Sequence, residues 1–141
     1  MSDPAKLEAF LAERRNVIVA GIRRDGRPQL TPNWFHFDGT RFYVSTMKNR
    51  AKYAVFSRDP RAVLLVDDST GFKAVVINGQ AEIWENLDMG LPYFRAIREK
   101  HGRDVPDDDE LLKASLAEED RFLLVITPDE PPSAWPTWGL D

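Results

Sequence analysis

Residues 41–62 decide the fold, and they read RFYVSTMKNRAKYAVFSRDPRA. The aromatic and β-branched side chains at 41–46 predict a strand. A short helix is expected next, with Thr46 or Asn49 as its N-cap. It should end by Asp59-Pro60, because the residue before a proline avoids the helical conformation. The nearly all-apolar run at 62–67 predicts that another strand follows at once.

Two strand-like runs joined by tight turns precede this stretch. Residues 17–22 and 29–37 flank Asp25-Gly26, which is a hairpin signal. Asp38-Gly39 supplies a second tight turn before the strand at 41–46. Pro32 lies inside the run at 29–37 and cannot donate a ladder hydrogen bond, so it predicts an edge position or a bulge.

The C-terminal half combines one long strand, two helical stretches and a final strand. Residues 73–84 alternate between two faces. One face holds Val75, Ile77, Gly79, Ala81 and Ile83, and the other holds Asn78, Gln80 and Glu82. Helices are expected over 4–15 and over 108–119. A further helix should follow the long strand and run to about His101, with Gly102 as its stop. The last strand is expected at 121–127.

These elements predict a mainly β fold with appended helices. Six strands and three or four short helices, mostly joined by short turns, favour a six-stranded antiparallel barrel. The chain of 141 residues is expected to form one domain over 1–141. Apolar residues make up 43% and charged residues 30%, which is a globular composition.

Composition and motifs exclude several classes of function. The chain has no cysteine, so disulfides, thiolate metal sites and a cysteine nucleophile are excluded. The only histidines are His36 and His101, without an HExxH motif, and no metal site is expected. No GxGxxG or Walker A loop is present. The net charge of −4 argues against nucleic acid or an anionic membrane as partners. Without a signal peptide or an 18-residue apolar run, a cytoplasmic protein is expected.

A basic cluster nevertheless lies at the start of the short central helix. Between Arg41 and Arg61 the chain has six basic residues against the single acid Asp59, an excess of +5. Lys48, Arg50 and Lys52 would repel the positive end of the helix unless an anion neutralised them. A phosphate is the simplest such anion, with the hydroxyls of Ser45 and Thr46 as further donors. A solvated basic helix is the alternative, and the residues alone do not decide between the two.

At this point the sequence resembles a known superfamily. Ser45–Lys52 followed by Phe56–Ala62 is similar to the signature of the split β-barrel flavin and deazaflavin oxidoreductases, the superfamily of pyridoxamine 5′-phosphate oxidase. Gly26–Leu30 followed by Trp34, and later Gly79–Ile83, resemble strands of its small deazaflavin-dependent branch. The resemblance covers a core of about residues 10–127 and leaves 128–141 as a tail rich in proline and tryptophan.

The resemblance implies a six-stranded split barrel, an FMN-binding-like fold that is usually a homodimer with two cofactors in clefts between the subunits. Arg50 and Lys52 match the phosphate-binding positions, and Lys48 is expected to join them. The ring system is expected to contact Trp34, Val44, Ser45, Thr46 and Gln80. Unpaired apolar faces, and a tail with little to pack on within one subunit, also favour a homodimer.

The resemblance also implies an oxidoreductase. It would transfer a hydride between a cofactor and a small unsaturated substrate, either aromatic or conjugated. The deazaflavin coenzyme F-420 is the favoured cofactor because its anionic oligoglutamate tail suits the excess of +5, and FMN is the alternative. Trp135 and Trp138 are expected to line the substrate pocket, and no catalytic residue is assigned.

One activity of the superfamily is not expected here, and two readings besides the oxidoreductase stay open. A tail without arginine beyond Arg121 makes oxidation of a vitamin B6 phosphate unexpected. The fold could instead serve a carrier or sensor that binds a cofactor without turnover. A haem-binding barrel is the third reading, for which His36, His101 and Met47 are the available axial ligands.

Overall fold

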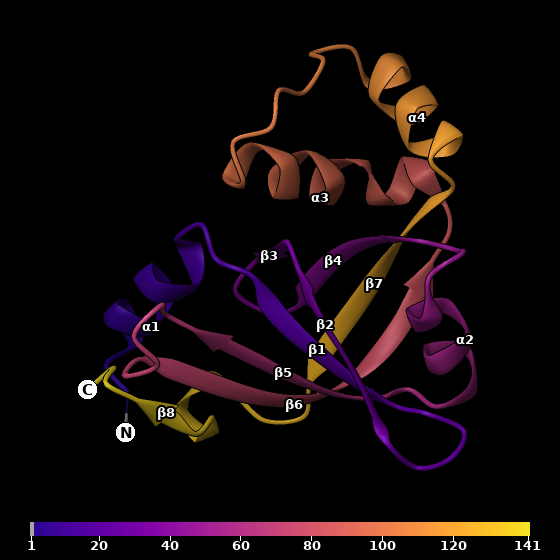
Figure 1. Cartoon of the computed structure of the whole chain (residues 1–141). Coiled ribbons are helices and arrows are strands. Elements are labelled where there is room, and N and C mark those ends of the chain that lie inside the picture. The colour runs from indigo at the N-terminus through magenta and orange to yellow at the C-terminus, as the bar shows by residue number, and fades with distance from the viewer. Residues whose placement is uncertain (1) are drawn as a thin grey trace.

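The computed structural model describes residues 2–141 and shows an antiparallel split barrel with helices attached outside it (Figure 1). The sheet follows the order β2-β1-β5-β6-β7-β4-β3, and β8 pairs with β6. Its strands are β1 (Val17–Ile22), β2 (Pro28–Asn33), β3 (Phe35–Phe37), β4 (Phe42–Met47), β5 (Arg61–Asp67), β6 (Ala74–Trp84), β7 (Arg121–Pro128) and β8 (Thr137–Trp138). The helices are α1 (Pro4–Ala12), α2 (Ala51–Arg58), α3 (Leu87–Lys100), α4 (Asp109–Glu118) and the 3-10 turn η1 (Pro132–Ala134).

The chain changes its partner strand at one residue, Trp34. The single strand predicted at 29–37 is wrong, because the chain breaks at Trp34 into β2 and β3. β2 pairs with β1 and β3 pairs with β4, so two consecutive strands lie at opposite ends of the sheet order. Only a strongly curved sheet can bring those ends within one residue of each other. Local strand propensity continues through residue 34 and cannot reveal this change of partner.

The edge position predicted from Pro32 is confirmed. Pro32 lies opposite Ile18 in the β1–β2 ladder, and β2 is the last strand at its end of the sheet. A residue without an N–H is tolerated there because no further strand needs its donor.

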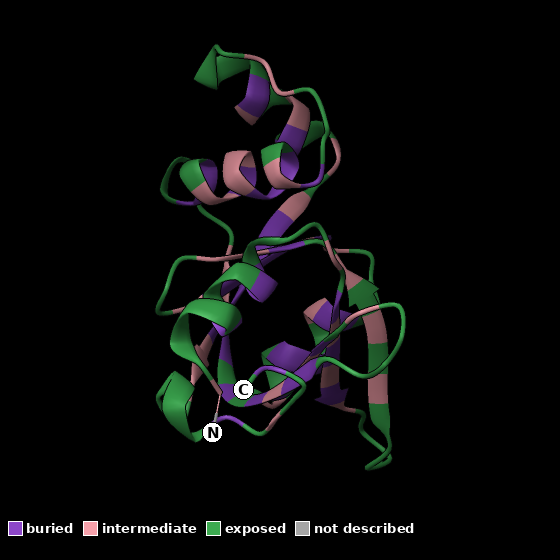
Figure 2. Ribbon diagram, turned by 90° about the vertical axis from the view of Figure 1, so that its left-hand side faces the viewer, coloured by how far each residue is buried: buried purple, intermediate pink, exposed green. Residues whose placement is uncertain are grey.

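β6 shows the predicted alternation and builds much of the core. Val75, Ile77, Gly79 and Ala81 are buried, whereas Asn78, Gln80 and Glu82 are exposed. A Cβ at Gly79 would lie 2.6 Å from the backbone oxygen of Thr127, so the close approach of β7 requires glycine there. Figure 2 shows buried positions in the barrel and in the helices above it. In the barrel, buried side chains from β1, β3, β4, β5, β6 and β7 pack together with α1 and α2.

The helices depart from the predictions at their ends. α1 ends at Ala12 rather than at residue 15, because Glu13 is extended. The N-cap of α2 is Arg50, without a side-chain cap, and not Thr46 or Asn49 as predicted. Thr46 is still inside β4 and cannot cap a helix that starts at Ala51. The predicted stops are confirmed: α2 ends before Asp59-Pro60, and Gly102 follows α3 with a φ of +74°.

α3 and α4 form a second layer over the outer face of β4 and β7 (Figure 1). Leu91, Phe94 and Ile97 of α3 pack with Leu112 and Leu116 of α4 in a cluster of their own. Tyr43, Leu123 and Val125 supply the sheet side of this cluster. The space between this layer and the start of β1 is where a polar hollow lies.

The tail packs on its own subunit, so the expectation that it finds little to pack on there is wrong. Trp135 is only 6% exposed and lies against Phe37 and Phe42, with its Nε1 donating to the Glu130 carbonyl. β8 adds to β6, and the Asp3 amide donates to the Leu140 carbonyl, so the two termini meet (Figure 1). Within residues 2–141, none of the helices has the length and apolar character that crossing a membrane takes.

Candidate functional site

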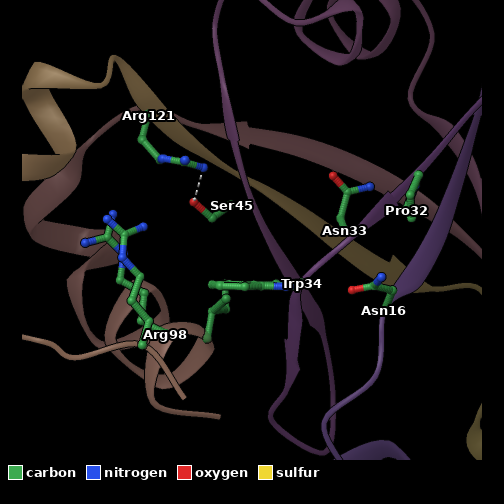
Figure 3. A pocket seen from close by; sticks show the side chains of 9 residues that line it. Asn16, Pro32, Asn33, Trp34, Ser45, Arg98 and Arg121 are labelled. Atoms are coloured by element: carbon green, nitrogen blue, oxygen red, sulfur yellow. Dashed lines mark hydrogen bonds between the residues drawn. The ribbon is translucent and has the colours of Figure 1, made fainter. Parts of the chain in front are cut away.

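A polar hollow of about 370 Å³ opens beside Trp34, and we call it the Trp34 hollow (Figure 3). Asn16, Pro32 and Asn33 line one side of it, next to β1 and on β2. The remaining lining residues are Ser45, Ile97, Arg98, Arg103 and Arg121. The hollow therefore collects residues from β2 at one end of the sheet order, from β4 and β7 toward the other end, and from the helical layer.

Trp34 is held in place by a neutral histidine. Its ring stacks on His101 with 4.8 Å between centroids and 8° between planes. His101 Nε2 accepts a hydrogen bond of 3.3 Å from the Phe35 amide. Burial, followed by the charge of Lys100, lowers the pKa of His101 to about 4. The tryptophan remains 42% exposed, so it offers a flat apolar surface to a ligand.

β4 turns one of its three predicted contact residues toward the hollow. Val44 and Thr46 are buried, with Val44 in the barrel core. Ser45 between them points outward, as strand alternation requires, and its Oγ accepts a hydrogen bond of 3.3 Å from Arg121 Nη1 (Figure 3). Of the three β4 residues predicted to contact the cofactor ring, Ser45 is therefore the one that lines the Trp34 hollow.

The three predicted phosphate-binding cations have different surroundings. Lys48 forms ion pairs with Glu85 at 3.0 Å and Asp120 at 3.6 Å, and the hydrogen bond to Glu85 is the main cause that raises its pKa. Arg50 is exposed and directly precedes α2. Lys52 is only 4% exposed, and its Nζ donates to Thr31 Oγ1 at 2.8 Å.

Arg50 and Lys52 fit the demands of a phosphate. Among the described residues neither has a carboxylate partner, and the nearest polar partner of Lys52 is a neutral hydroxyl. Burial, then the charge of Arg50, lowers the pKa of Lys52. A buried cation beside a second cation is costly unless an anion joins them. The sequence did not indicate this role of Thr31, because nothing in the pattern of β2 distinguishes its hydroxyl.

The sequence also did not indicate a cluster of three arginines that lines the Trp34 hollow. Arg98 comes from α3, Arg103 follows that helix, and Arg121 begins β7. All three surround the carboxylate of Glu119, at 3.5 Å from Arg98, 3.6 Å from Arg103 and 2.6 Å from Arg121. These residues are too widely spaced in the sequence for a motif to reveal them, and only the fold brings them together.

Three predicted site residues lie elsewhere in the subunit. Gln80 is on the outer face of β6 and lines a different hollow together with Arg61. It pairs with Thr127, whereas Ser45 pairs with Leu123, which is about 13 Å away along β7. Trp135 is in the barrel core, and Trp138 is 53% exposed on β8. Within one subunit none of the three lines the Trp34 hollow.

A comparison with protein families places these features in context. Residues 4–131 match the family model described as pyridoxamine 5′-phosphate oxidase. The match spans the whole barrel, including β2, β4 and α2, and stops within the tail.

Solved structures share the fold at low sequence identity. The conserved hypothetical protein Rv2991 from Mycobacterium tuberculosis is 22% identical with a TM-score of 0.81, covering 98% of this chain and 85% of that one. An F420 reductase is 22% identical with a TM-score of 0.67, covering 87% and 93%. The heme storage protein HutZ from Vibrio cholerae is 16% identical with a TM-score of 0.76, covering 99% and 97%. At these identities the likeness establishes a common fold and no more.

Proposed function

The chain belongs to the pyridoxamine 5′-phosphate oxidase family, and we propose that within it the chain is an oxidoreductase that uses coenzyme F-420. Its substrate is a small unsaturated molecule, aromatic or conjugated, that binds beside Trp34. The cofactor phosphate binds between Arg50 and Lys52, and the ring system lies along β4 past Ser45. The bound cofactor supplies the hydride, while the protein binds, orients and shields the reactants.

One observation carries this proposal, namely that Lys52 is buried beside a second cation without a carboxylate partner. The long aliphatic stem of a lysine usually lets its ammonium group reach solvent. Lys52 of α2 instead directs its Nζ to Thr31 Oγ1 on the edge strand β2. A phosphate at this place would neutralise both charges and accept hydrogen bonds from both side chains. Ser45 lies five residues before Arg50, so the end of β4 and the turn after it connect the Trp34 hollow to the proposed phosphate position.

The choice of F-420 over FMN depends on charge. Both cofactors carry a phosphate, but the oligoglutamate tail of F-420 adds several carboxylates. Arg41, Arg58 and Arg61 supply positive charge in addition to Arg50 and Lys52, and of these three only Arg61 has a carboxylate within 4.0 Å among the described residues. FMN remains the second candidate, because the same two cations suit its phosphate equally.

We further propose that the active form is a homodimer. Leu30 on β2 and Val63 on β5 both lie opposite Ala20 of β1, so they form one row across the sheet. They are 59% and 41% exposed, which is unusual for apolar side chains gathered on one face. A second subunit covering this row would also let Gln80 and Trp138 complete a cleft that one subunit leaves open.

A haem carrier is supported less well by the same residues. His101 Nε2 already accepts from the Phe35 amide, and its ring is covered by Trp34. The imidazole of His36 stacks on Tyr43 at 6.1 Å between centroids. Neither histidine lines the Trp34 hollow, which favours a flavin-type ligand over haem there.

Separate titrations with F-420, FMN and haem test the proposal. Purified protein carries Trp34 as a fluorescent reporter in the proposed cleft, and binding is followed by its quenching. We expect saturable binding of F-420, weaker binding of FMN and no stoichiometric haem binding. Rapid reduction of a quinone or an enone by the reduced cofactor would then separate an enzyme from a carrier. Tight haem binding with no response to either flavin would contradict the proposal.

A further inference from the structure

The arginine cluster of the Trp34 hollow has more positive charge than the protein neutralises. Arg98, Arg103 and Arg121 share the single carboxylate of Glu119. Asp120, the adjacent acid, instead pairs with Lys48, which also holds Glu85. Three guanidinium groups against one carboxylate leave an excess of two positive charges on one side of a hollow.

Arg98 shows this shortage of partners most clearly. The residue is 5% exposed, and its Nη2 has no hydrogen-bond partner among the described residues. That nitrogen lies 3.5 Å from Glu119 Oε2, but the same oxygen accepts the hydrogen bond from Arg121 Nε. Buried donors are nearly always satisfied in folded proteins, so an orphan of this kind needs an explanation. An anion bound in the hollow would explain the unpaired nitrogen, because it would accept hydrogen bonds from the arginine cluster and neutralise its excess charge.

The position of the cluster relative to Trp34 says what kind of anion fits. In Figure 3 the side chains of Arg98 and Arg121 lie to the left of the tryptophan ring, Ser45 lies above it, and the two asparagines lie to its right. The ring is partly exposed and is backed by His101 on one face. A ligand that lies against this ring and reaches the arginines therefore needs a flat apolar body with an anionic end.

We propose that the Trp34 hollow binds a planar aromatic or conjugated carboxylate, with its ring against Trp34 and its carboxylate at the arginine cluster. This assignment rests on the proposed function in one respect, because it names the substrate class of that oxidoreductase. The hollow of about 370 Å³ has room for a ligand of one or two rings.

The cofactor phosphate has a separate place in this arrangement. Arg50 and Lys52 belong to the start of α2 and face β2 through Thr31, whereas the arginine cluster comes from α3, the segment after it and β7. Two sets of cations on different elements allow one anion for each. The arginines could still hold a cofactor phosphate or tail carboxylate, which shares the same chemistry, so the experiment separates the sources.

The test uses naphthoate and its neutral analogue naphthamide as probes on the whole protein without cofactor. Binding is followed by tryptophan fluorescence and confirmed by calorimetry. We expect saturable binding of naphthoate that is roughly tenfold or more tighter than binding of naphthamide, as charge-assisted hydrogen bonds imply. Arg103→Gln and Arg121→Gln should remove this preference, and Arg24→Gln, in the exposed turn after β1, should retain it.

Arg103→Gln keeps the test valid if a variant of the more buried arginines fails to fold, because Arg103 is the most exposed of the three. Equal binding of the two probes by the native protein would overturn the proposal, and so would an unchanged preference in Arg103→Gln.

A second arm separates the substrate from the cofactor as the source of the anion. FMN and riboflavin, which lacks the phosphate, are titrated into the native protein and the two arginine variants, and F-420 is titrated alongside. We expect all three affinities to stay within about twofold of native. If the variants weakened FMN but not riboflavin, the cluster would be a cofactor phosphate site; if only F-420 weakened, it would hold the cofactor tail. Either result overturns the proposal. Failure of the native protein to bind any flavin would instead contradict the proposed function and leave the naphthoate result independent.

Discussion

Lys52 and Thr31 connect the first turn of α2 to the edge strand β2 through one hydrogen bond of 2.8 Å between Nζ and Oγ1. Thr31 Oγ1 also accepts from Asn33 Nδ2 at 3.1 Å, so one hydroxyl serves two donors. The bond holds a buried cation at the place where Arg50 adds a second charge. The proposed phosphate site therefore exists as a local concentration of positive charge before a ligand arrives.

Removing the hydroxyl should destabilise the protein without cofactor. Thr31→Val keeps the shape of the side chain but leaves Lys52 Nζ without its acceptor, whereas Asn33 Nδ2 keeps its bond to the Thr31 carbonyl. We expect the free energy of unfolding to fall by about 1–3 kcal/mol, as measured by urea denaturation. Thr40→Val, on an exposed turn, is the matched control and should change it little. Inorganic phosphate should restore part of the loss in Thr31→Val, and no response to phosphate would count against an anion beside Lys52.

His101 should make stability depend on pH in a defined range. The pKa of its imidazole is about 4 in the folded protein, against 6.5 in the unfolded chain. Between these values the unfolded chain binds more protons, so the contribution is fully present above pH 6.5 and is lost as pH falls toward 4. His36 acts in the same direction, because burial lowers its pKa as well.

The His101→Phe variant isolates this effect, since a ring stays against Trp34 but no longer titrates. Native protein should lose about 2–3 kcal/mol of unfolding free energy from His101 between neutral pH and about pH 4.5, by urea denaturation. The variant should be less stable at neutral pH, because the Phe35 amide loses its acceptor, yet its stability should fall less with pH. Equal slopes in the two proteins would show that His101 is not neutralised by the fold.

Glu119 should be important for stability through Arg98. Glu119→Gln would leave the buried guanidinium of Arg98 without a counter-charge. Because Glu119 itself is 31% exposed and the pair is only partly buried, we expect a cost of about 1–3 kcal/mol. Asp88→Asn, which removes an exposed partner of Lys113, is the control and should cost well under about 1 kcal/mol. Differential scanning calorimetry measures both, and equal shifts in Tm would contradict the buried role of Arg98.

The proposed dimer gives a prediction about its apolar row. Val63→Glu places a charge in the row that Leu30 and Val63 form across β1, and burying it against a second subunit would be costly. We expect light scattering after gel filtration to show a dimer for the native protein and a monomer for the variant. Ala117→Glu, at an exposed position of α4, controls for a general effect of added charge. A native protein that is monomeric at all concentrations would contradict the dimer.

Much of the barrel could be predicted from local signals. The alternation of β6, the edge position of Pro32 and the end of α2 before Asp59-Pro60 each follow from backbone or side-chain geometry within a few residues. Such features depend on the backbone conformation and hydrogen-bonding groups of individual residues, which the sequence shows directly. The fold class follows because these local signals agree with one another along the chain.

Features that depend on distant partners could not be predicted. The break at Trp34 follows from the closure of the sheet, and Trp135 is buried because Phe37 and Phe42 leave room for it. The arginine cluster is the clearest case in the candidate site. Arg98 and Arg121 are separated by α4 in the sequence, and both look like ordinary surface charges until the packing of α3 brings them to one carboxylate.

The central claim, that Lys52 holds a cofactor phosphate, is tested most directly by Lys52→Met titrated with FMN and with riboflavin. Methionine fills the buried position without charge, so the fold should be retained, and Lys73→Met, at an exposed position directly before β6, is the matched control. We predict that Lys52→Met weakens FMN at least about tenfold, leaves riboflavin unchanged and weakens F-420 as strongly as FMN. Native affinity for FMN in a folded Lys52→Met protein would contradict the account.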